Sequence, residues 1–293
     1  MSAVTILDAN QLSKSYGSIV ALEGATVRFE EDKIYGLFGR NGAGKTTLLD
    51  ILSARIYANK GEVHCFGQDI LTKPESISQH CCYMPEKNFF PKRFKVQKLL
   101  DHAKASFPHY DETYAARLCQ AFSLNANQKY GALSRGYQSI FRIVIGLASN
   151  APITIFDEPV LGLDAVARDR FYGELIAAFA DNPRLFIVST HYIDESVDLF
   201  NEAIILKDGR VIRQGAVDEM LANVFYVSGK AAHVDAFVAD DTVISQQAIG
   251  GLKTAVIDGT PPHQPVPGLS FSSLTMQKLF IHLTNDEDSW EQP

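Results

Sequence analysis

Residues 39–46 of this chain read Gly39-Arg40-Asn41-Gly42-Ala43-Gly44-Lys45-Thr46. The stretch fits the pattern G-x-x-x-x-G-K-[ST] at every fixed position. It follows a short apolar run at residues 33–38, which is typical of a buried strand, and it precedes a helical pattern at residues 46–53. Because a strand–loop–helix context is what the pattern requires, the sequence predicts a phosphate-binding loop.

The chemistry of this loop depends on its glycines and on its last two residues. Glycine lets backbone N–H groups turn toward a phosphate, and the N-terminus of the following helix adds a partial positive charge. We expect Lys45 to place a positive charge beside the β- and γ-phosphates, and Thr46 to offer a hydroxyl to Mg²⁺. The sequence has no N-K-x-D loop of the kind that recognises guanine, so a GTPase is the weaker interpretation.

A pair of acids follows an apolar strand pattern at residues 153–156. Asp157 and Glu158 would then lie at the carboxyl end of that strand, where open α/β sheets bind ligands. Asp157 is predicted to support Mg²⁺, and Glu158 to polarise an attacking water as a general base. Adjacent acids after a strand also occur in solvated turns, but Pro159 and the segment after it favour the catalytic interpretation.

Periodic patterns indicate how the first part of the chain is organised. Half-buried strands are predicted at residues 2–10 and 20–30, and an apolar strand at residues 185–189. Residues 204–212 predict a hairpin whose turn is Asp208-Gly209. Strands separated by helices imply a mostly parallel sheet, with a helical lobe at about residues 86–150.

The pattern of apolar and polar residues changes after about residue 224. Short strand-like runs stand at residues 225–227, 243–248 and 253–257, and a helical pattern at residues 274–283. We therefore predict a nucleotide-binding domain over residues 1–224 and a small α+β appendage over residues 225–293.

Composition narrows the class of protein. The net charge of −7 does not suggest a nucleic-acid-binding protein, because such proteins carry an excess of basic residues. No apolar run approaches the roughly 20 residues of a membrane-spanning helix, and the N-terminus has no signal-peptide pattern. The four cysteines have no C-x-x-C spacing, so reduced thiols of a cytosolic protein are the simplest interpretation for Cys65, Cys81, Cys82 and Cys119.

Further motifs occur in a fixed order over residues 2–224, and together they resemble the nucleotide-binding subunits of ABC transporters. In family terms they are the adenine-stacking aromatic Tyr16 in Lys14-Ser15-Tyr16-Gly17, the Walker A loop at residues 39–47, the Q-loop Tyr83-Met84-Pro85-Glu86, the signature motif Leu133-Ser134-Arg135-Gly136-Tyr137-Gln138, the Walker B end Asp157-Glu158, the D-loop Leu161-Gly162-Leu163-Asp164 and the switch region Ser189-Thr190-His191. The resemblance implies an α/β P-loop NTPase of the ABC-cassette fold, with a mostly parallel sheet core, an antiparallel β subdomain and a helical subdomain.

The resemblance also implies an ATPase that uses ATP and Mg²⁺. Nucleotide contacts would come from Tyr16, Gly39, Asn41, Gly42, Ala43, Gly44, Lys45, Thr46, Thr47, Glu86, Ser134, Gly136 and Asp164, metal ligands from Thr46, Glu86 and Asp157, and catalytic groups from Glu158, His191 and Lys45. Because Ser134 and Gly136 would open a helix, they would form an anion site for the γ-phosphate held by a second cassette.

The expected partners follow from the same resemblance. They are a second cassette, either a copy of this chain or a paralogue, and a transmembrane permease on a separate chain. The protein would then lie at the cytoplasmic face of the membrane. One rival is a soluble ABC ATPase of translation or repair, but this chain has a single cassette and no long coiled coil. A second rival, a non-enzymatic regulatory module, is disfavoured by the intact Glu158 and His191.

Three positions depart from the family pattern. Glu86 replaces the usual Q-loop glutamine, Arg135 the first signature glycine and Tyr137 the signature glutamine. Residues 133–149 nevertheless resemble bacterial ABC-2 type exporters, whose signature commonly reads L-S-R-G, and residues 272–284 resemble the end of such cassettes. These similarities predict an exporter subunit.

The segment at residues 87–95 mixes four basic residues with three phenylalanines. Three interpretations stay open: a dock for the permease's coupling helix, a solvated loop with its phenylalanines folded inward, and a nucleic-acid contact. Because the segment follows the Q-loop directly, the first is favoured.

Overall fold

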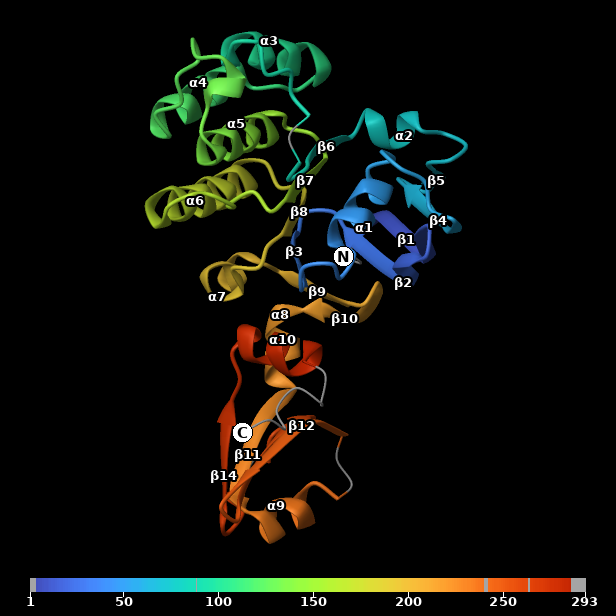
Figure 1. Cartoon of the computed structure of the whole chain (residues 1–293), viewed down its shortest axis with the longest axis vertical. Coiled ribbons are helices and arrows are strands. Elements are labelled where there is room, and N and C mark those ends of the chain that lie inside the picture. The colour runs from blue at the N-terminus through green and yellow to red at the C-terminus, as the bar shows by residue number, and fades with distance from the viewer. Residues whose placement is uncertain (1–3, 88, 240–241, 263, 286–293) are drawn as a thin grey trace. The chain divides into compact units, whose positions relative to one another are not determined.

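The computed structural model describes residues 4–87, 89–239, 242–262 and 264–285. The chain divides into two compact units, one made of Met1–His191 and Asp198–Gln214, and the other of Tyr192–Val197 and Gly215–Pro293 (Figure 1). The boundary predicted after residue 224 stays a prediction. No helix within the described ranges is both long and apolar enough to cross a membrane.

The core of the first unit is a six-stranded sheet that is mostly parallel, as predicted. Its strands lie in the order β10 (Arg210–Ala216), β9 (Glu202–Lys207), β3 (Ile34–Gly39), β8 (Leu185–Ser189), β7 (Ile153–Asp157) and β6 (Cys81–Met84). Every residue of β3, β7 and β8 is buried. Both faces of these parallel strands are covered, which is why their sequences are nearly continuous apolar runs.

Strand order, rather than chain order, brings the motifs together. β3, which leads into the phosphate loop, lies between β8 and β9, and β7 pairs with the other side of β8. In the parallel register, Ser189 at the end of β8 is the partner of both Leu37 and Asp157. The Walker A, Walker B and switch-histidine segments therefore all leave the sheet at the carboxyl ends of its parallel strands.

A second, antiparallel sheet belongs to the same unit. Its strands lie in the order β2 (Ile19–Glu30), β1 (Thr5–Tyr16), β4 (Lys60–Cys65) and β5 (Gln68–Asp69). Helix α1 (Lys45–Leu52) contacts strands of both sheets, and the leucines of α1 share one apolar core with them. Burial of that core holds the helix N-terminus in place.

Two features of this unit complete the frame of the site. In the predicted hairpin between β9 and β10, Asp208 and Gly209 both have positive φ angles of 47° and 76°, as a two-residue turn of type I′ requires. The amide of Gly209 donates to the carbonyl of Ala43 in the phosphate loop, at 3.0 Å. The turn thus supports the loop from a distance of more than 160 residues along the chain.

The helical lobe contains α3 (Val96–Ser106), α4 (Glu112–Ala121), the 3₁₀ turn η1 (Tyr130–Ala132) and α5 (Arg135–Ala148), and it is followed by α6 (Ala165–Asp181). A short helix α2 (Glu75–Ser78) precedes β6. Helix α5 contacts α3, α4, α6, β6 and β7, and residues 139–148 of it are all buried. It is therefore the helix that joins the lobe to the main sheet.

The second unit is a small α+β structure with its own core, as predicted. Its antiparallel sheet has the order β12 (Thr242–Ile249), β13 (Leu252–Asp258), β11 (Val224–Lys230) and β14 (Leu269–Ser273). Its described residues form the helices α7 (Ile193–Ser196), α8 (Val217–Ala222), α9 (Ala231–Phe237) and α10 (Met276–Thr284), and they include the first residue of η2 (Val197–Leu199). β14 and α9 were not predicted, because they are short and carry polar residues.

Candidate active site

The phosphate loop adopts a backbone that favours glycine at two positions. Gly44 is the N-cap of α1 with φ 104°, and Gly42 has φ 87°. Both angles lie in the left-handed region, which side chains with a Cβ avoid. The loop can therefore present its backbone N–H groups and the positive end of α1 to one point.

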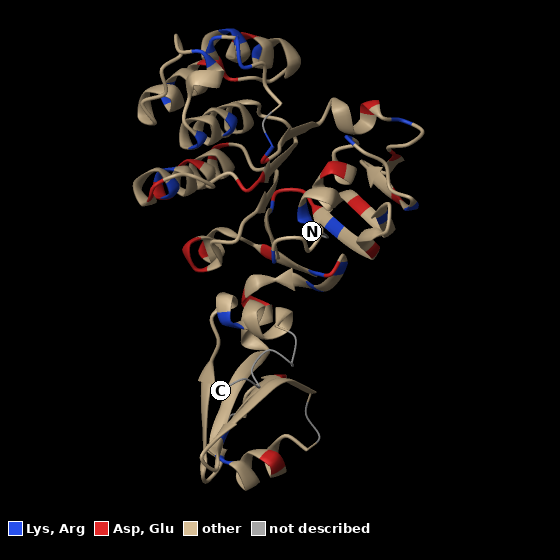
Figure 2. Cartoon of the chain, viewed as in Figure 1, with Lys and Arg blue, Asp and Glu red and all other residues tan. Residues whose placement is uncertain are grey.

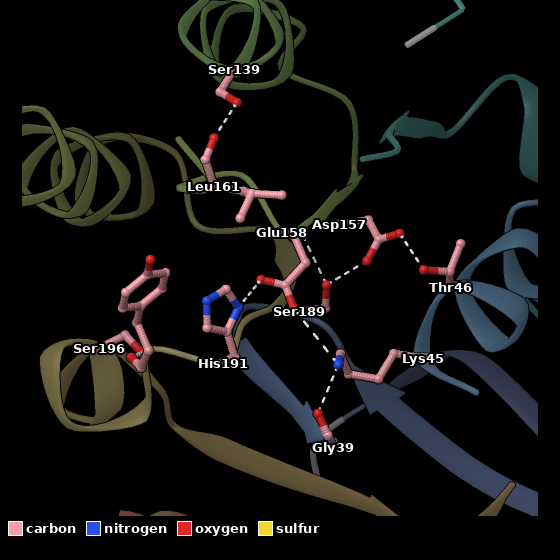
Figure 3. A network of polar contacts seen from close by, with 11 residues as sticks. Gly39, Lys45, Thr46, Ser139, Asp157, Glu158, Leu161, Ser189, His191 and Ser196 are labelled. Atoms are coloured by element: carbon pink, nitrogen blue, oxygen red, sulfur yellow. Dashed lines mark hydrogen bonds and ion pairs between the residues drawn. The ribbon is translucent and has the colours of Figure 1, made fainter. Parts of the chain in front are cut away.

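The side chain of Lys45 points toward the same place as the loop amides, although it is almost fully buried. Its side chain is 8% exposed, and its Nζ donates to the carbonyl oxygen of Gly39 at 2.7 Å. The carboxylate Oε1 of Glu158 lies 3.7 Å from the same Nζ (Figure 3). A buried ammonium group with so few acceptors has donor capacity left for an anionic ligand.

Asp157 is held by two hydroxyl groups. Its Oδ2 accepts from Thr46 Oγ1 at 2.8 Å, and its Oδ1 accepts from Ser189 Oγ at 2.6 Å. A carboxylate and a threonine hydroxyl are hard oxygen ligands that fit Mg²⁺. No group of three His, Cys, Asp or Glu residues in the described part of the chain could hold a metal.

Glu158 lies between a cation and a histidine. Its Oε2 is 2.8 Å from His191 Nδ1 and its Oε1 faces Lys45 (Figure 3). The backbone of Glu158 has φ 49°, a strained angle for a residue with a side chain. Its N–H donates to Ser189 Oγ at 2.9 Å, so one hydroxyl braces both acids of the motif.

These groups face a cavity of about 550 Å³ in the first unit. The residues that line it are Ile19, Val20, Ala21, Arg40, Asn41, Gly42, Gly44, Lys45, Thr46, Thr47, Glu86, Glu158, Leu161 and His191. Most of the predicted nucleotide contacts of one subunit are thus together, including Glu86. Gly39, Ala43 and Asp157 lie behind the wall, where they support it.

Tyr16 does not line this cavity, although an adenine-stacking role was predicted for it. It ends β1 and is 50% exposed, with Lys14 Nζ 5.5 Å from the centre of its ring. The exposed side chains of Ile19 and Val20, at the start of β2, line the cavity instead. An apolar pair beside a turn, where solvated residues are usual, is the sequence feature that marks this wall of the cavity.

The remaining predicted contacts lie elsewhere in the same unit. Ser134, Gly136 and Asp164 line a second cavity of about 350 Å³ beside the first turns of α5 and α6. Ser134 caps α5 by accepting from the amide of Tyr137 at 3.3 Å, and Asp164 caps α6 by accepting from the amide of Ala167 at 2.8 Å. Within one chain, therefore, the signature residues do not line the cavity that holds Lys45.

Known proteins resemble this chain in sequence and in fold. The ABC transporter family model matches residues 22–161. The ABC transporter ATP-binding protein YtrB of Bacillus subtilis (strain 168) is 28% identical over 215 residues, which cover 73% of this chain and 73% of that protein. Nod factor export ATP-binding protein I of Burkholderia orbicola (strain AU 1054) is 26% identical, covering 73% and 72% respectively. A solved dimeric structure of a bacterial ABC transporter cassette has a TM-score of 0.65 at 21% identity, over 72% of this chain and 98% of that one.

The chain is therefore similar to the ATP-binding proteins of ABC transporters. It is an ATPase of the ABC-cassette fold, with the mixed sheets and helical lobe that the motifs implied. The roles of its individual site residues stay predictions, which the geometry of the cassette supports to different degrees.

In the segment at residues 87–95, one phenylalanine is folded inward and another is half exposed. Phe90 packs edge-on against Tyr130 and Phe141 and points inward, whereas Phe89 is half exposed and stacks on Phe90 with ring centres 4.4 Å apart. Basic positions gather around α3 and the loop before it (Figure 2). Asn88 lies outside the described residues.

Two residues in the cassette were missed as parts of the site. Ser189 was quoted only as part of the switch region, yet its hydroxyl joins both Walker B acids. Arg142 was not singled out, yet its guanidinium donates to the backbone at the Q-loop position. Neither role could be read from sequence, because each contact spans more than 30 residues.

Proposed function

We propose that this chain is the ATP-hydrolysing subunit of an ABC exporter, in which two cassettes close around two ATP molecules and drive a separate transmembrane permease. The observation that carries the proposal is the division of the predicted nucleotide contacts between two cavities. One cavity has Lys45, Glu158 and His191, and the other has Ser134 and Gly136. A head-to-tail pair would bring the second cavity of one copy to the first cavity of the other.

Within the first cavity, the loop amides and Lys45 would bind the phosphates of ATP. Glu158 would accept a proton from the attacking water, while the oxygen of that water bonds to the γ-phosphorus and the bond from that phosphorus to ADP breaks. The contact between Glu158 and His191 would orient the carboxylate and let the imidazole face the γ-phosphate. A bound Mg²⁺, held by Thr46 and Asp157, would neutralise charge on the phosphates.

Glu86 would act at the edge of the same cavity. Its backbone is fixed by Arg142, while its side chain is exposed. A carboxylate offers the same kind of oxygen to Mg²⁺ as the glutamine usual at this position. We propose that Glu86 supplies such an oxygen in place of that glutamine.

Export is supported by two features. The signature of this chain reads Leu133-Ser134-Arg135-Gly136, as in ABC-2 type exporters, and one similar protein is named for Nod factor export.

The half-exposed Phe89 and the basic side chains around α3 offer an amphipathic surface beside the Q-loop. We propose that the permease binds there through a cytoplasmic helix, which would bring the chain to the inner face of the membrane.

The proposal is tested by co-purification from detergent-solubilised membranes. A tagged Glu158→Gln protein should retain an integral membrane protein in fixed stoichiometry with Mg-ATP, and gel filtration of the isolated chain should show an ATP-dependent dimer. Lys45→Ala is the control, because it removes the main cation of the phosphate site and should abolish tight ATP binding. Recovery of a monomer without a membrane partner at every ATP concentration would contradict the proposal and favour a soluble ATPase.

A further inference from the structure

Arg142 is a charged residue buried in the middle of α5. It is 6% exposed. Its Nη1 donates to the carbonyl oxygens of both Pro85 and Glu86, and its Nη2 donates to Ser139 Oγ at 2.8 Å. One guanidinium therefore fixes the backbone of the segment from which the Glu86 side chain enters the nucleotide cavity.

The same face of α5 contacts the segment after Glu158. Ser139 Oγ donates to the carbonyl oxygen of Leu161 at 2.9 Å (Figure 3). One turn earlier, a Cβ placed on Gly136 would lie 2.6 Å from the carbonyl oxygen of Gly162, so helix and loop are in close contact there. Positions 136, 139 and 142 are three residues apart and share one face of the helix.

The helix thus joins two walls of the nucleotide cavity to the second cavity. Glu86 and Leu161 both line the first cavity, and Gly136 lines the second. Neither Arg142 nor Ser139 lines either cavity. A displacement of the backbone at Glu86 would therefore be passed through Arg142 and Ser139 to Leu161 and to the first turn of α5.

The charge of Arg142 indicates more than packing. Burial lowers the pKa of this guanidinium, because a cation loses hydration in the interior. Among the described residues, its hydrogen-bond acceptors are two carbonyls and one hydroxyl, with no carboxylate. The planar fork of arginine fixes several acceptors at once, which an apolar side chain of the same size could not do.

We propose that Arg142 is a positioning residue that makes the Glu86 segment, the D-loop at residues 161–164 and the signature end of α5 respond together to bound nucleotide. The inference rests on the proposed function, since it assigns Glu86 to the nucleotide and the signature end to a second cassette. Arg142 acts through other residues and does not touch the substrate.

Arg184 provides a matched control in the same unit. It is 5% exposed, and its guanidinium donates to the carbonyl oxygens of Asn182 and Leu147, at 3.2 and 3.0 Å. Burial lowers its pKa to about 10. It therefore shares the burial and the carbonyl contacts of Arg142, but it contacts the C-terminal end of α5, away from Glu86 and the D-loop.

Hydrogen exchange of the full-length chain tests the coupling. Wild type, Arg142→Gln, Arg142→Lys and Arg184→Gln are compared with and without Mg-ATP, by following peptides over residues 82–90 and 158–166. In wild type, nucleotide should protect both peptides. In Arg142→Gln, exchange in the 158–166 peptide should rise about tenfold with ATP bound, as expected for one lost hydrogen bond. Arg142→Lys should recover part of the protection, and Arg184→Gln should match wild type.

Steady-state kinetics give a second readout. Arg142→Gln should lower kcat about tenfold while KM for ATP changes less than about threefold, because the phosphate contacts are unchanged. Normal exchange and kcat in a folded Arg142→Gln protein would overturn the proposal, as would equal changes in Arg184→Gln. If Arg142→Gln does not fold, Ser139→Ala, which removes the hydroxyl that joins Arg142 to Leu161, must raise exchange in the 158–166 peptide, or the proposal is wrong.

The two proposals fail in different ways. Loss of the membrane partner and of the ATP-dependent dimer in the wild-type chain would contradict the proposed function. The exchange experiment needs only nucleotide binding by the isolated chain. It would still show whether Arg142 couples the two loops.

Discussion

The two cavities of the first unit are built in different ways. The first joins charged side chains from distant segments, so that Lys45, Asp157, Glu158 and His191 contact one another or their shared neighbours within 4 Å. The second is lined by the caps and first turns of α5 and α6 together with mostly apolar side chains, and Arg170 is the only basic residue among the described residues of its lining. Ser134 and Asp164 direct their oxygens at their own helices, and Gly136 contributes the absence of a side chain.

The two linings fit two different roles: the first cavity would carry out hydrolysis, and the second would take part in the association of two cassettes. A group of buried charges that are already in contact is prepared to act on a bound phosphate without reorganisation. A helix N-terminus with a small residue on its surface is a site of shape and partial charge, which gains from an anion brought to it. Changes in the first cavity should therefore affect turnover most, and changes in the second should affect association.

The largest expected effect tests the first cavity. Glu158→Gln keeps the shape of the side chain but cannot accept a proton, so phosphate release should slow by a factor of about 10²–10⁴, equivalent to roughly 3–5 kcal/mol in the barrier. ATP binding should remain, and the ATP-bound dimer should accumulate. Glu112→Gln, in an exposed ion pair with Lys104, is the control and should not change the rate. Wild-type turnover in folded Glu158→Gln would remove Glu158 as the base.

The next effect tests whether the two Walker B acids depend on one hydroxyl. Ser189→Ala removes a hydrogen bond to Asp157 and the acceptor for the amide of Glu158, and bonds to charged groups contribute about 1.5–3 kcal/mol. We expect kcat to fall roughly 10- to 100-fold, with a higher Mg²⁺ requirement in a titration of activity. The control is Ser196→Ala, a buried serine that donates to Tyr192 in the second unit. Unchanged kcat and Mg²⁺ dependence in Ser189→Ala would show that the acids hold their positions without it.

A smaller effect separates the second cavity from the first. Gly136→Ala would place a Cβ 2.6 Å from the carbonyl oxygen of Gly162, which forces the D-loop or α5 to shift. In the Glu158→Gln background, the ATP concentration needed for dimerisation should rise about tenfold, or roughly 1.4 kcal/mol, while ATP affinity of the monomer stays the same. Light scattering and a fluorescent ATP analogue measure the two quantities.

Gly173→Ala is the matched control for that change, because an added Cβ there meets nothing within 4 Å. It should leave dimerisation unaltered. If Gly136→Ala weakens ATP binding by the monomer as strongly as it weakens dimerisation, the separation of the two cavities by role is wrong.

The smallest effect concerns the departure at the edge of the first cavity. Glu86→Gln exchanges one side-chain oxygen donor for another, so ATP affinity and kcat should change by less than about threefold. Phosphate release at saturating Mg-ATP measures the change, and the ATP analogue measures the affinity. Complete loss of turnover would show that the negative charge of Glu86 has a catalytic role of its own.

Much of the fold was predictable because its signals are local. The phosphate loop, the buried strands β7 and β8 and the Asp208-Gly209 hairpin each follow from the pattern of a few consecutive residues. β14 and β5 were missed because short strands have weak periodicity, and they form only by pairing with a neighbour already in place.

The residues of the candidate site also differ in whether a local motif reveals them. Lys45, Asp157, Glu158 and His191 could be named from motifs, since each motif carries its chemistry in its residue types. Tyr16 shows the limit of that approach, because the turn between β1 and β2 leaves it outside the lining of the cavity. The apolar pair that lines the cavity there was recognised only in three dimensions.

The phosphate-loop motif between a strand and a helix, and the two acids and the histidine that we propose for hydrolysis, could be recognised from sequence alone, since they depend on residue type and spacing over a few positions. Only the tertiary structure decided that Ser189 braces both acids, that Arg142 fixes the backbone at Glu86, and that the signature residues face a separate cavity. These features depend on strand order and helix packing, which bring together atoms from segments that are far apart in the chain. No local pattern records that proximity, because it results from burial of the whole apolar core.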